Sequence, residues 1–207
     1  MPTPAQKMRA QKIYRELGKR YPDAHIALKY KTPIQLLAAV VMSAQCTDKK
    51  VNEITAELFK TYKTLDDFAD AKIAKFEKEI RQCGFYRQKA KNIIASARMI
   101  RDDFGGRVPR TMAEITKLPG VARKSGNVIL GNVYGVVEGI AVDTHVMRLS
   151  QRYGFTKEKD PVKIERDLMA LFPKSQWFSL TYRLIEHGRA VCKAPKCKDP
   201  DNCFHKS

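Results

Sequence analysis

Two side chains near the middle of the chain have the chemistry of a nucleophile and its electrostatic partner. Lys124 follows a turn formed by Pro119 and Gly120, and Asp143 stands in the sequence Val-Asp-Thr-His further along. A Pro-Gly turn that opens a helix offers backbone N–H groups to a phosphate, and a lysine in the first turn is then aimed at the molecule carrying it. An unprotonated lysine amine attacks electrophilic sugar and carbonyl carbons, and a nearby carboxylate stabilises positive charge on a sugar ring. The pair predicts an enzyme that acts on nucleic acid.

The composition favours a polyanionic partner. The 207 residues include 39 Lys and Arg against 22 Asp and Glu, for a formal net charge of +17. Nucleic acid and an anionic membrane surface both fit. We favour nucleic acid, because no polybasic block lies beside an apolar anchor and no apolar stretch approaches the roughly 20 residues of a spanning helix. Five cysteines, an odd number, argue against a disulfide scaffold. We expect a cytoplasmic, nucleoid-associated protein in a bacterium or archaeon, and a nuclear one in a eukaryote.

Hydrophobic spacing predicts a chain built from helices, with no clear period-two strand. Thr32 is expected to cap one helix with Pro33 at its first position, Asp48 to cap the next, and Ser175 to open the last. The expected helices cover about residues 5–20, 34–42, 48–62, 76–83, 88–104, 112–118, 123–134, 144–153, 161–171 and 175–187. Residues 136–142 are expected to form a short connection.

Four ordered motifs resemble the endonuclease III family of helix-hairpin-helix DNA glycosylases. They are Leu36–Asp48, Gly84–Ala90, Leu118–Leu130 and Ala141–Val146, which follow one another in the family's order. His187-Gly188-Arg189 before Cys192 also resembles the entry to the family's cluster region, so the resemblance covers nearly the whole chain. The resemblance implies an all-α, two-lobed fold with the active site in the cleft between the lobes. Residues 27–135 would form a helical barrel that contains the helix-hairpin-helix, and residues 1–26 with 136–207 would form the second lobe.

The resemblance also implies a mechanism. The target base is swung out of the duplex, because its sugar carbon cannot be reached inside the stack. Lys124 then attacks C1′, displaces the base and forms a Schiff base, after which β-elimination nicks the strand. Asp143 would stabilise the oxocarbenium-like charge. The implied partner is double-stranded DNA with oxidised pyrimidines or abasic sites, bound by a monomer. Burial, Arg123 and the helix N-terminus are expected to favour loss of the lysine proton.

The resemblance also implies which residues contact the DNA. Gln45 would enter the hole left by the flipped base, and Phe85 would act as a wedge where an aliphatic residue is more usual. The implied contacts are Gln45, Phe85, Tyr86, Arg87, Lys89, Gly120, Val121, Ala122, Arg123 and His145. Three other interpretations stay open: Lys124 as a surface lysine that contacts phosphate, Asp143 as a plain N-cap, and Phe85 as a core residue.

The cysteines of the C-terminal tail depart from the family pattern. Relatives usually carry four cysteines that hold a [4Fe–4S] cluster, whereas this tail has Cys192, Cys197 and Cys203. His205 follows the last cysteine too closely to reach the same metal easily. The donor count therefore favours no cofactor, with an iron–sulfur cluster as the first alternative and zinc as the second.

Two other functions remain open on the sequence. A monofunctional glycosylase activates water and needs no amine, so Lys124 argues against it. A non-catalytic DNA-binding module could use the hairpin for backbone contacts alone, but it would need neither Asp143 nor Gln45. The sequence therefore favours a bifunctional DNA glycosylase and AP lyase.

Overall fold

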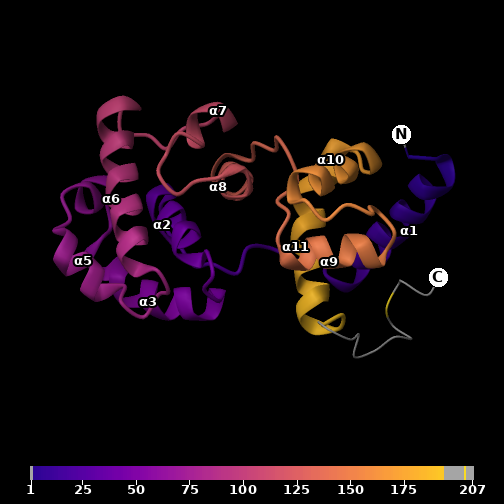
Figure 1. Cartoon of the computed structure of the whole chain (residues 1–207), viewed down its shortest axis with the longest axis horizontal. Coiled ribbons are helices and arrows are strands. Elements are labelled where there is room, and N and C mark those ends of the chain that lie inside the picture. The colour runs from indigo at the N-terminus through magenta and orange to yellow at the C-terminus, as the bar shows by residue number, and fades with distance from the viewer. Residues whose placement is uncertain (1, 194–202, 204–207) are drawn as a thin grey trace. The chain divides into compact units, whose positions relative to one another are not determined.

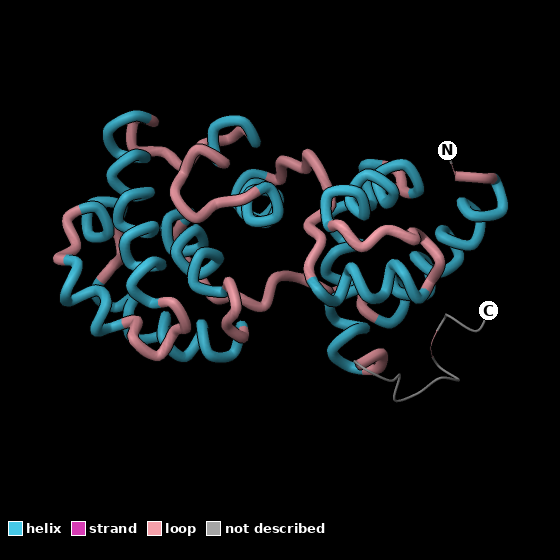
Figure 2. Tube along the Cα trace, in the orientation of Figure 1, coloured by secondary structure: helices cyan, strands magenta, loops and turns pink. Residues whose placement is uncertain are grey.

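The computed structural model describes residues 2–193 and residue 203, and all regular structure within them is helical (Figures 1 and 2). In chain order the helices are α1 Pro4–Arg20, α2 Pro33–Ser43, α3 Asp48–Thr61, α4 Leu65–Ala69, α5 Ile73–Glu79, α6 Tyr86–Asp103, α7 Met112–Ile115, α8 Arg123–Tyr134, α9 Thr144–Arg152, α10 Pro161–Leu171 and α11 Lys174–Ala190. The predicted all-α class is confirmed. In this part of the chain, no helix has both the length and the apolar character needed to cross a bilayer.

The chain divides into two compact units. The central unit is Ala27–Val136, and the terminal unit joins Met1–Ile26 to Val137–Ser207. Helices α2 to α8 belong to the central unit, and α1 with α9 to α11 belongs to the terminal unit. Lys124 therefore lies in the central unit and Asp143 in the terminal unit.

Helix α2 is the buried element of the central unit. Every residue from Ile34 to Met42 is buried, and the helix packs against α3, α6 and α8. Its start follows the predicted pattern: the Thr32 hydroxyl accepts the Gln35 N–H, and Pro33 occupies the first turn without needing a hydrogen-bond acceptor. The one buried amide of this helix is satisfied, because Gln35 Nε2 donates to the Tyr62 carbonyl at 3.1 Å. The helix thus joins the elements that carry the site.

Several predicted helix boundaries differ from the observed ones, and the residues expected to open α3 and α11 are each off by one position. Thr47, not Asp48, caps α3, and Asp48 is its first helical residue, where its negative charge faces the positive end of the helix. Helix α11 begins at Lys174 rather than Ser175, after an N-cap proline whose extended backbone leads into the helix. A helix also ends later than predicted: α11 continues past Gly188 to Ala190.

The helix-hairpin-helix is formed by α7, a turn and α8. Gly126 lies in α8, close to side chains of α7. A Cβ atom at Gly126 would lie 2.8 Å from Met112 Sδ and 3.1 Å from Ile115 Cγ2, nearer than side chains normally approach. A side chain at this position would therefore require Met112 and Ile115 to shift.

The terminal unit has its own core. Helix α11 packs against α1 and α9, and α10 packs against the same two helices. Apolar side chains from all four helices and the intervening loops fill this core, the largest fully buried one being Tyr153. At its edge, Gln11 and Gln176 exchange amide hydrogen bonds of 3.0 and 2.9 Å, which fix α1 against α11. This packing positions α9, which begins just after Asp143.

Candidate active site

The hairpin turn is held in one shape by its backbone and by α6. The Val121 N–H donates to the Leu118 carbonyl at 3.1 Å, and Gly120 has a φ of 81°, as expected at the third position of a type II turn. A Cβ atom at Gly120 would lie 2.6 Å from Asn92 Nδ2, so glycine is needed for space as well as for conformation. The Ser96 hydroxyl donates to the Pro119 carbonyl at 3.0 Å. The turn is therefore fixed before any ligand arrives.

The start of α8 is suited to an anion. Its N-cap is Ala122, which makes no side-chain cap hydrogen bond, and its first turn contains no acidic residue. Helix N-termini of this kind carry partial positive charge and N–H donors that a phosphate can accept from. Ala122 and Arg123 are exposed here, whereas the Val121 side chain is buried and anchors the turn. For Val121, only the backbone is available to a ligand.

Lys124 is the second residue of α8, and its side chain is exposed. Lys124 is not buried in the described structure, so the expectation that burial helps this amine lose its proton is wrong. The amine stands within one helical turn of the N–H donors that suit a phosphate.

Asp143 is the N-cap of α9. Its Oδ1 accepts the Val146 N–H at 2.8 Å, and the residue is half-buried. The capping interpretation is therefore observed. A carboxylate has two oxygens, so capping through Oδ1 does not by itself engage Oδ2. The cap fixes the direction of the carboxylate, which is what an electrostatic role would also require.

Gln45 and Phe85 share an uncommon backbone conformation. Among the described residues, they alone combine a side chain with a positive φ, at 53° and 58°. Such values are rare outside glycine, and they cluster at functional sites where the surrounding structure enforces them. The two segments are adjacent, because a Cβ atom at Gly84 would lie 3.7 Å from the Gln45 carbonyl oxygen. Both residues are exposed, Phe85 by 68%, so the interpretation of Phe85 as a core residue is wrong.

Lys89 departs from its predicted role as a DNA contact. Its side chain is only 5% exposed, and its Nζ donates to the carbonyls of Met42 at 2.8 Å and Ala44 at 2.6 Å. It also lies 3.1 Å from Cys83 Sγ, and burial raises the pKa of that thiol while the ammonium opposes the rise. An ammonium that is buried and bonded in this way is not presented to a phosphate. Instead, Lys89 holds the end of α2 that leads into Gln45.

A signal for the buried Lys89 was present in the sequence. Counting along α6, Lys89 stands four residues before Ile93 and eight before Ala97, on the face that is buried. Neither residue type nor resemblance pointed to this role, because lysine is almost always exposed. The helical period alone indicates it.

The other expected contacts divide into two groups. Arg87 is exposed in the first turn of α6, with its guanidinium 5.5 Å from the ring centroid of Tyr86. His145, in contrast, is enclosed in the terminal unit: a Cβ atom at Gly188 would lie 2.6 Å from its Nδ1, and Arg148 Nη2 lies 3.3 Å from the same atom. Tyr86 and Arg87 can therefore contact a ligand directly, while one ring nitrogen of His145 serves the packing of α9 against α11.

A group of metal-binding side chains lies at the end of α11. His187, Cys192 and Cys203 are all buried, and their ligand atoms lie within 4.8 Å of one another. The sequence argument counted the cysteines but not His187. Cys197 and His205, two other candidates, lie outside the described residues. The structure thus contains a Cys/His group that could hold a metal.

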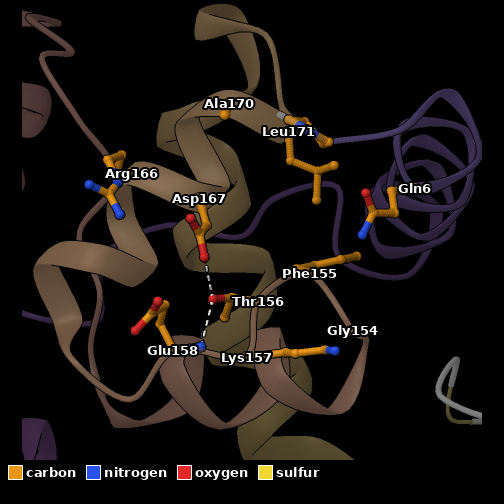
Figure 3. A pocket seen from close by; sticks show the side chains of 11 residues that line it. Gln6, Gly154, Phe155, Thr156, Lys157, Glu158, Arg166, Asp167, Ala170 and Leu171 are labelled. Carbon is orange, nitrogen blue, oxygen red and sulfur yellow. Dashed lines mark hydrogen bonds between the residues drawn. The ribbon is translucent and has the colours of Figure 1, made fainter.

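A separate pocket of about 560 Å³ lies in the terminal unit (Figure 3). It is formed by the start of α1, the loop after α9 and one face of α10. Inside it, Thr156 Oγ1 donates to Asp167 Oδ2 at 2.6 Å and accepts the Glu158 N–H at 3.0 Å. None of the residues that line this pocket is one of the predicted site residues.

Comparison with known proteins agrees with this arrangement. The model of the HhH-GPD superfamily of base excision DNA repair proteins matches residues 38–174. Endonuclease III of Synechocystis sp. is 48% identical over 192 residues, which make up 93% of this chain and 88% of that protein. Endonuclease III of Bacillus subtilis is 43% identical over 187 residues, or 89% of this chain and 85% of that protein.

Solved structures agree as well. The structure of a trapped endonuclease III–DNA covalent intermediate matches with a TM-score of 0.90 at 42% identity, covering 97% of this chain and 93% of that one. A non-covalent endonuclease III–DNA complex matches with the same score and identity, covering 97% and 92%. A thermostable thymine-DNA glycosylase, 20% identical, shares the fold with a TM-score of 0.83. With its hairpin, its exposed lysine and relatives of this similarity, the chain belongs to the endonuclease III family of the HhH-GPD superfamily.

Proposed function

We propose that this chain is a bifunctional DNA glycosylase and AP lyase, which removes oxidised pyrimidines from duplex DNA and nicks the strand during base excision repair. One observation carries the proposal: Lys124 stands in the first turn of α8, directly after a rigid turn whose N–H groups suit a phosphate. A relative 42% identical to this chain has been trapped as a covalent intermediate with DNA. An amine in this position is the group that such an intermediate requires.

The proposed reaction is an addition followed by an elimination. The Lys124 amine bonds to C1′ of the deoxyribose, the bond from C1′ to the base breaks, and the base leaves with a proton. The C1′–O4′ bond then breaks as nitrogen forms a double bond to C1′, O4′ takes up a proton, and the resulting iminium ion makes a C2′ proton acidic. Loss of that proton breaks the C3′–O bond and releases the 3′ fragment of the strand, which carries a 5′-phosphate. Water then hydrolyses the imine and frees the lysine. The bond changes involve no oxidant and no reductant, so we propose that this chemistry itself proceeds without a cofactor.

Because Lys124 is exposed, the bound DNA must exclude water from its amine. In the free chain, the Lys124 side chain is exposed to water. A bound duplex excludes that water, and a desolvated amine loses its proton more readily. We propose that lesion binding, rather than the fold alone, prepares the nucleophile. Asp143 would stabilise the positive charge on the sugar, with its direction fixed by the cap bond to Val146.

The exposed pair Gln45 and Phe85 would open the duplex. A flipped base leaves a gap in the stack, and side chains that enter the gap compensate for lost stacking. Stacking of a base on an aromatic ring is worth about 1–3 kcal/mol in proteins that bind single strands. Both side chains are held outward by backbone that is already in the left-handed region, so they need no rearrangement to enter. We propose Tyr86, Arg87, Arg123 and the backbone of Gly120–Ala122 as the flanking contacts to phosphates.

Borohydride trapping tests the proposal. Wild-type protein mixed with a thymine-glycol duplex and borohydride is expected to give a covalent protein–DNA adduct, because reduction fixes the Schiff base. Lys124→Ala should give none. Lys117→Ala removes an exposed lysine just before the hairpin and serves as the matched control, with trapping preserved. Base release without an adduct would indicate a monofunctional glycosylase, and binding without either product would indicate a non-catalytic module; each result would overturn the proposal.

We further propose that the protein acts as a monomer where chromosomal DNA lies, which is the cytoplasm of a bacterium or archaeon and the nucleus of a eukaryote. Its net charge of +17 supports a DNA partner. Binding should weaken steeply with salt, because each neutralised phosphate releases counterions.

A further inference from the structure

The side chains of His187, Cys192 and Cys203 form a compact set of metal-binding donors in the terminal unit. All three are buried, and their ligand atoms lie within 4.8 Å of one another. His187 belongs to α11, Cys192 follows the end of that helix, and Cys203 returns to it from further along the chain. Two soft thiolate donors and one imidazole are the ligand types that zinc prefers in proteins.

The spacing of these atoms fits a single ion. Zinc binds sulfur at about 2.3 Å and imidazole nitrogen at about 2.0–2.1 Å, so the S···N edge of a tetrahedral site is about 3.5 Å long. The distance between Cys203 Sγ and His187 Nε2 is 3.5 Å. These two atoms can therefore share one ion with little movement of either side chain.

Neighbouring groups orient the donors. Tyr21 Oη lies 3.2 Å from His187 Nδ1, so a proton on Nδ1 would leave Nε2 directed at Cys203. Metal-binding histidines commonly have their second nitrogen held in this way, and the held nitrogen fixes the tautomer. On the other side, Arg152 Nη1 donates to Cys192 Sγ at 2.9 Å, which holds this sulfur in place.

The same donors do not fit the iron–sulfur cluster that the family resemblance implies. A cubane cluster takes four thiolates, each on a different iron at a separate corner. The tail contains three cysteines, and a histidine nitrogen lies beside one of the sulfurs at the separation expected around one ion. We propose that His187, Cys192 and Cys203 bind one zinc ion, in place of the family's cluster. The ion would tie the C-terminal segment to the end of α11.

This inference revises the expectation drawn from the cysteines alone. That expectation weighed three thiolates and His205, and it favoured no metal. His187 supplies an imidazole from α11, the helix that precedes the tail. It is an additional metal donor that the spacing of the cysteines alone does not show.

Metal analysis of the purified full-length protein tests the proposal. The expected result is about one zinc per chain, no acid-labile sulfide and no visible absorption band of an iron–sulfur cluster. After removal of zinc with a chelator, addition of cobalt(II) should give the visible bands of a tetrahedral ion together with thiolate-to-cobalt charge transfer. Iron with equivalent sulfide, or zinc far below one per chain with no cobalt spectrum, would overturn the proposal.

Variants identify the ligands. His187→Gln and Cys203→Ser should each lower the bound zinc at least tenfold, and Tyr21→Phe should weaken affinity by about 10–100-fold, as expected for a group that orients a ligand. His25→Gln and Cys83→Ser remove the same residue types elsewhere and should retain the ion. Circular dichroism shows whether each variant is folded. If a variant unfolds, the cobalt spectrum of the wild-type protein still reports which ligand types bind the ion. Zinc retained in folded His187→Gln and Cys203→Ser would refute the assignment.

Discussion

Lys89→Met separates a lysine that supports the fold from one that binds DNA. Methionine fills a similar volume, so the change removes three donor contacts and leaves almost no cavity. The Met42 carbonyl keeps a weak bond from the Cys83 thiol at 3.2 Å, and Ala44 is exposed enough for water to reach its carbonyl. An unsatisfied buried polar group costs about 1–3 kcal/mol. With these partial replacements, we expect a loss of about 2 kcal/mol in the free energy of unfolding.

Urea unfolding followed by circular dichroism measures this loss, with Lys91→Met as the matched control. Lys91 is an exposed lysine on the same helix, so its replacement should change stability by no more than about 0.5 kcal/mol. A second assay compares excision of thymine glycol with nicking at a preformed abasic site. Because Lys89 holds the backbone that leads into Gln45, excision should fall about tenfold, equivalent to about 1.4 kcal/mol, and nicking should fall less. The reasoning is refuted if stability is unchanged while DNA affinity and its salt dependence both decrease, since that is the behaviour of a phosphate contact.

Three further changes have distinct expected outcomes. Asp143→Asn should change the free energy of unfolding by no more than about 0.5 kcal/mol, because asparagine caps helices equally well. It should lower the single-turnover rate of base excision by about a hundredfold or more. If excision falls only as far as the lost stability explains, Asp143 is a helix cap alone. Gly126→Ala should destabilise the protein by about 1–3 kcal/mol in urea, because its Cβ would meet Met112 and Ile115. Backbone hydrogen bonds to Asp67 from Thr64 and Lys63 lower its pKa from 3.8, so its contribution to stability is present above that pH and lost as the pH falls through the lowered value. Asp67→Asn should therefore flatten the acid limb of a stability–pH profile, and an unchanged limb would contradict the assignment.

Local patterns were enough to predict the helical fold and the places of the two proposed catalytic residues. Thr32 and Pro33 predict the start of α2, because helix capping depends on a few neighbouring residues. Pro119 and Gly120 predict the turn before Lys124, because turn type also depends on a few neighbouring residues. Whether these catalytic roles are correct remains a prediction, which trapping and the Asp143→Asn variant test.

Long-range placements could not be predicted in the same way. His187 and Cys203 are 16 residues apart, and no local periodicity shows that the tail returns to α11. Lys89 bonds to carbonyls more than 40 residues earlier, and the usual exposure of lysine suggested the opposite placement. The positive φ of Phe85 also follows from tertiary packing, since its residue type disfavours that conformation.

The left-handed backbone at Gln45 and Phe85 has a consequence for how the protein would search a genome. Such a conformation costs about 1–3 kcal/mol per residue, and here the cost is met once, when the chain folds. Each encounter with a new base pair then begins with both probing side chains already extended. If they had to be extended at every step, the ready conformation would be rarer by about tenfold for each 1.4 kcal/mol, and interrogation of undamaged sequence would slow by the same factor. If these residues have the proposed role, the protein would give up some folding stability for faster scanning, through the backbone conformation of Gln45 and Phe85.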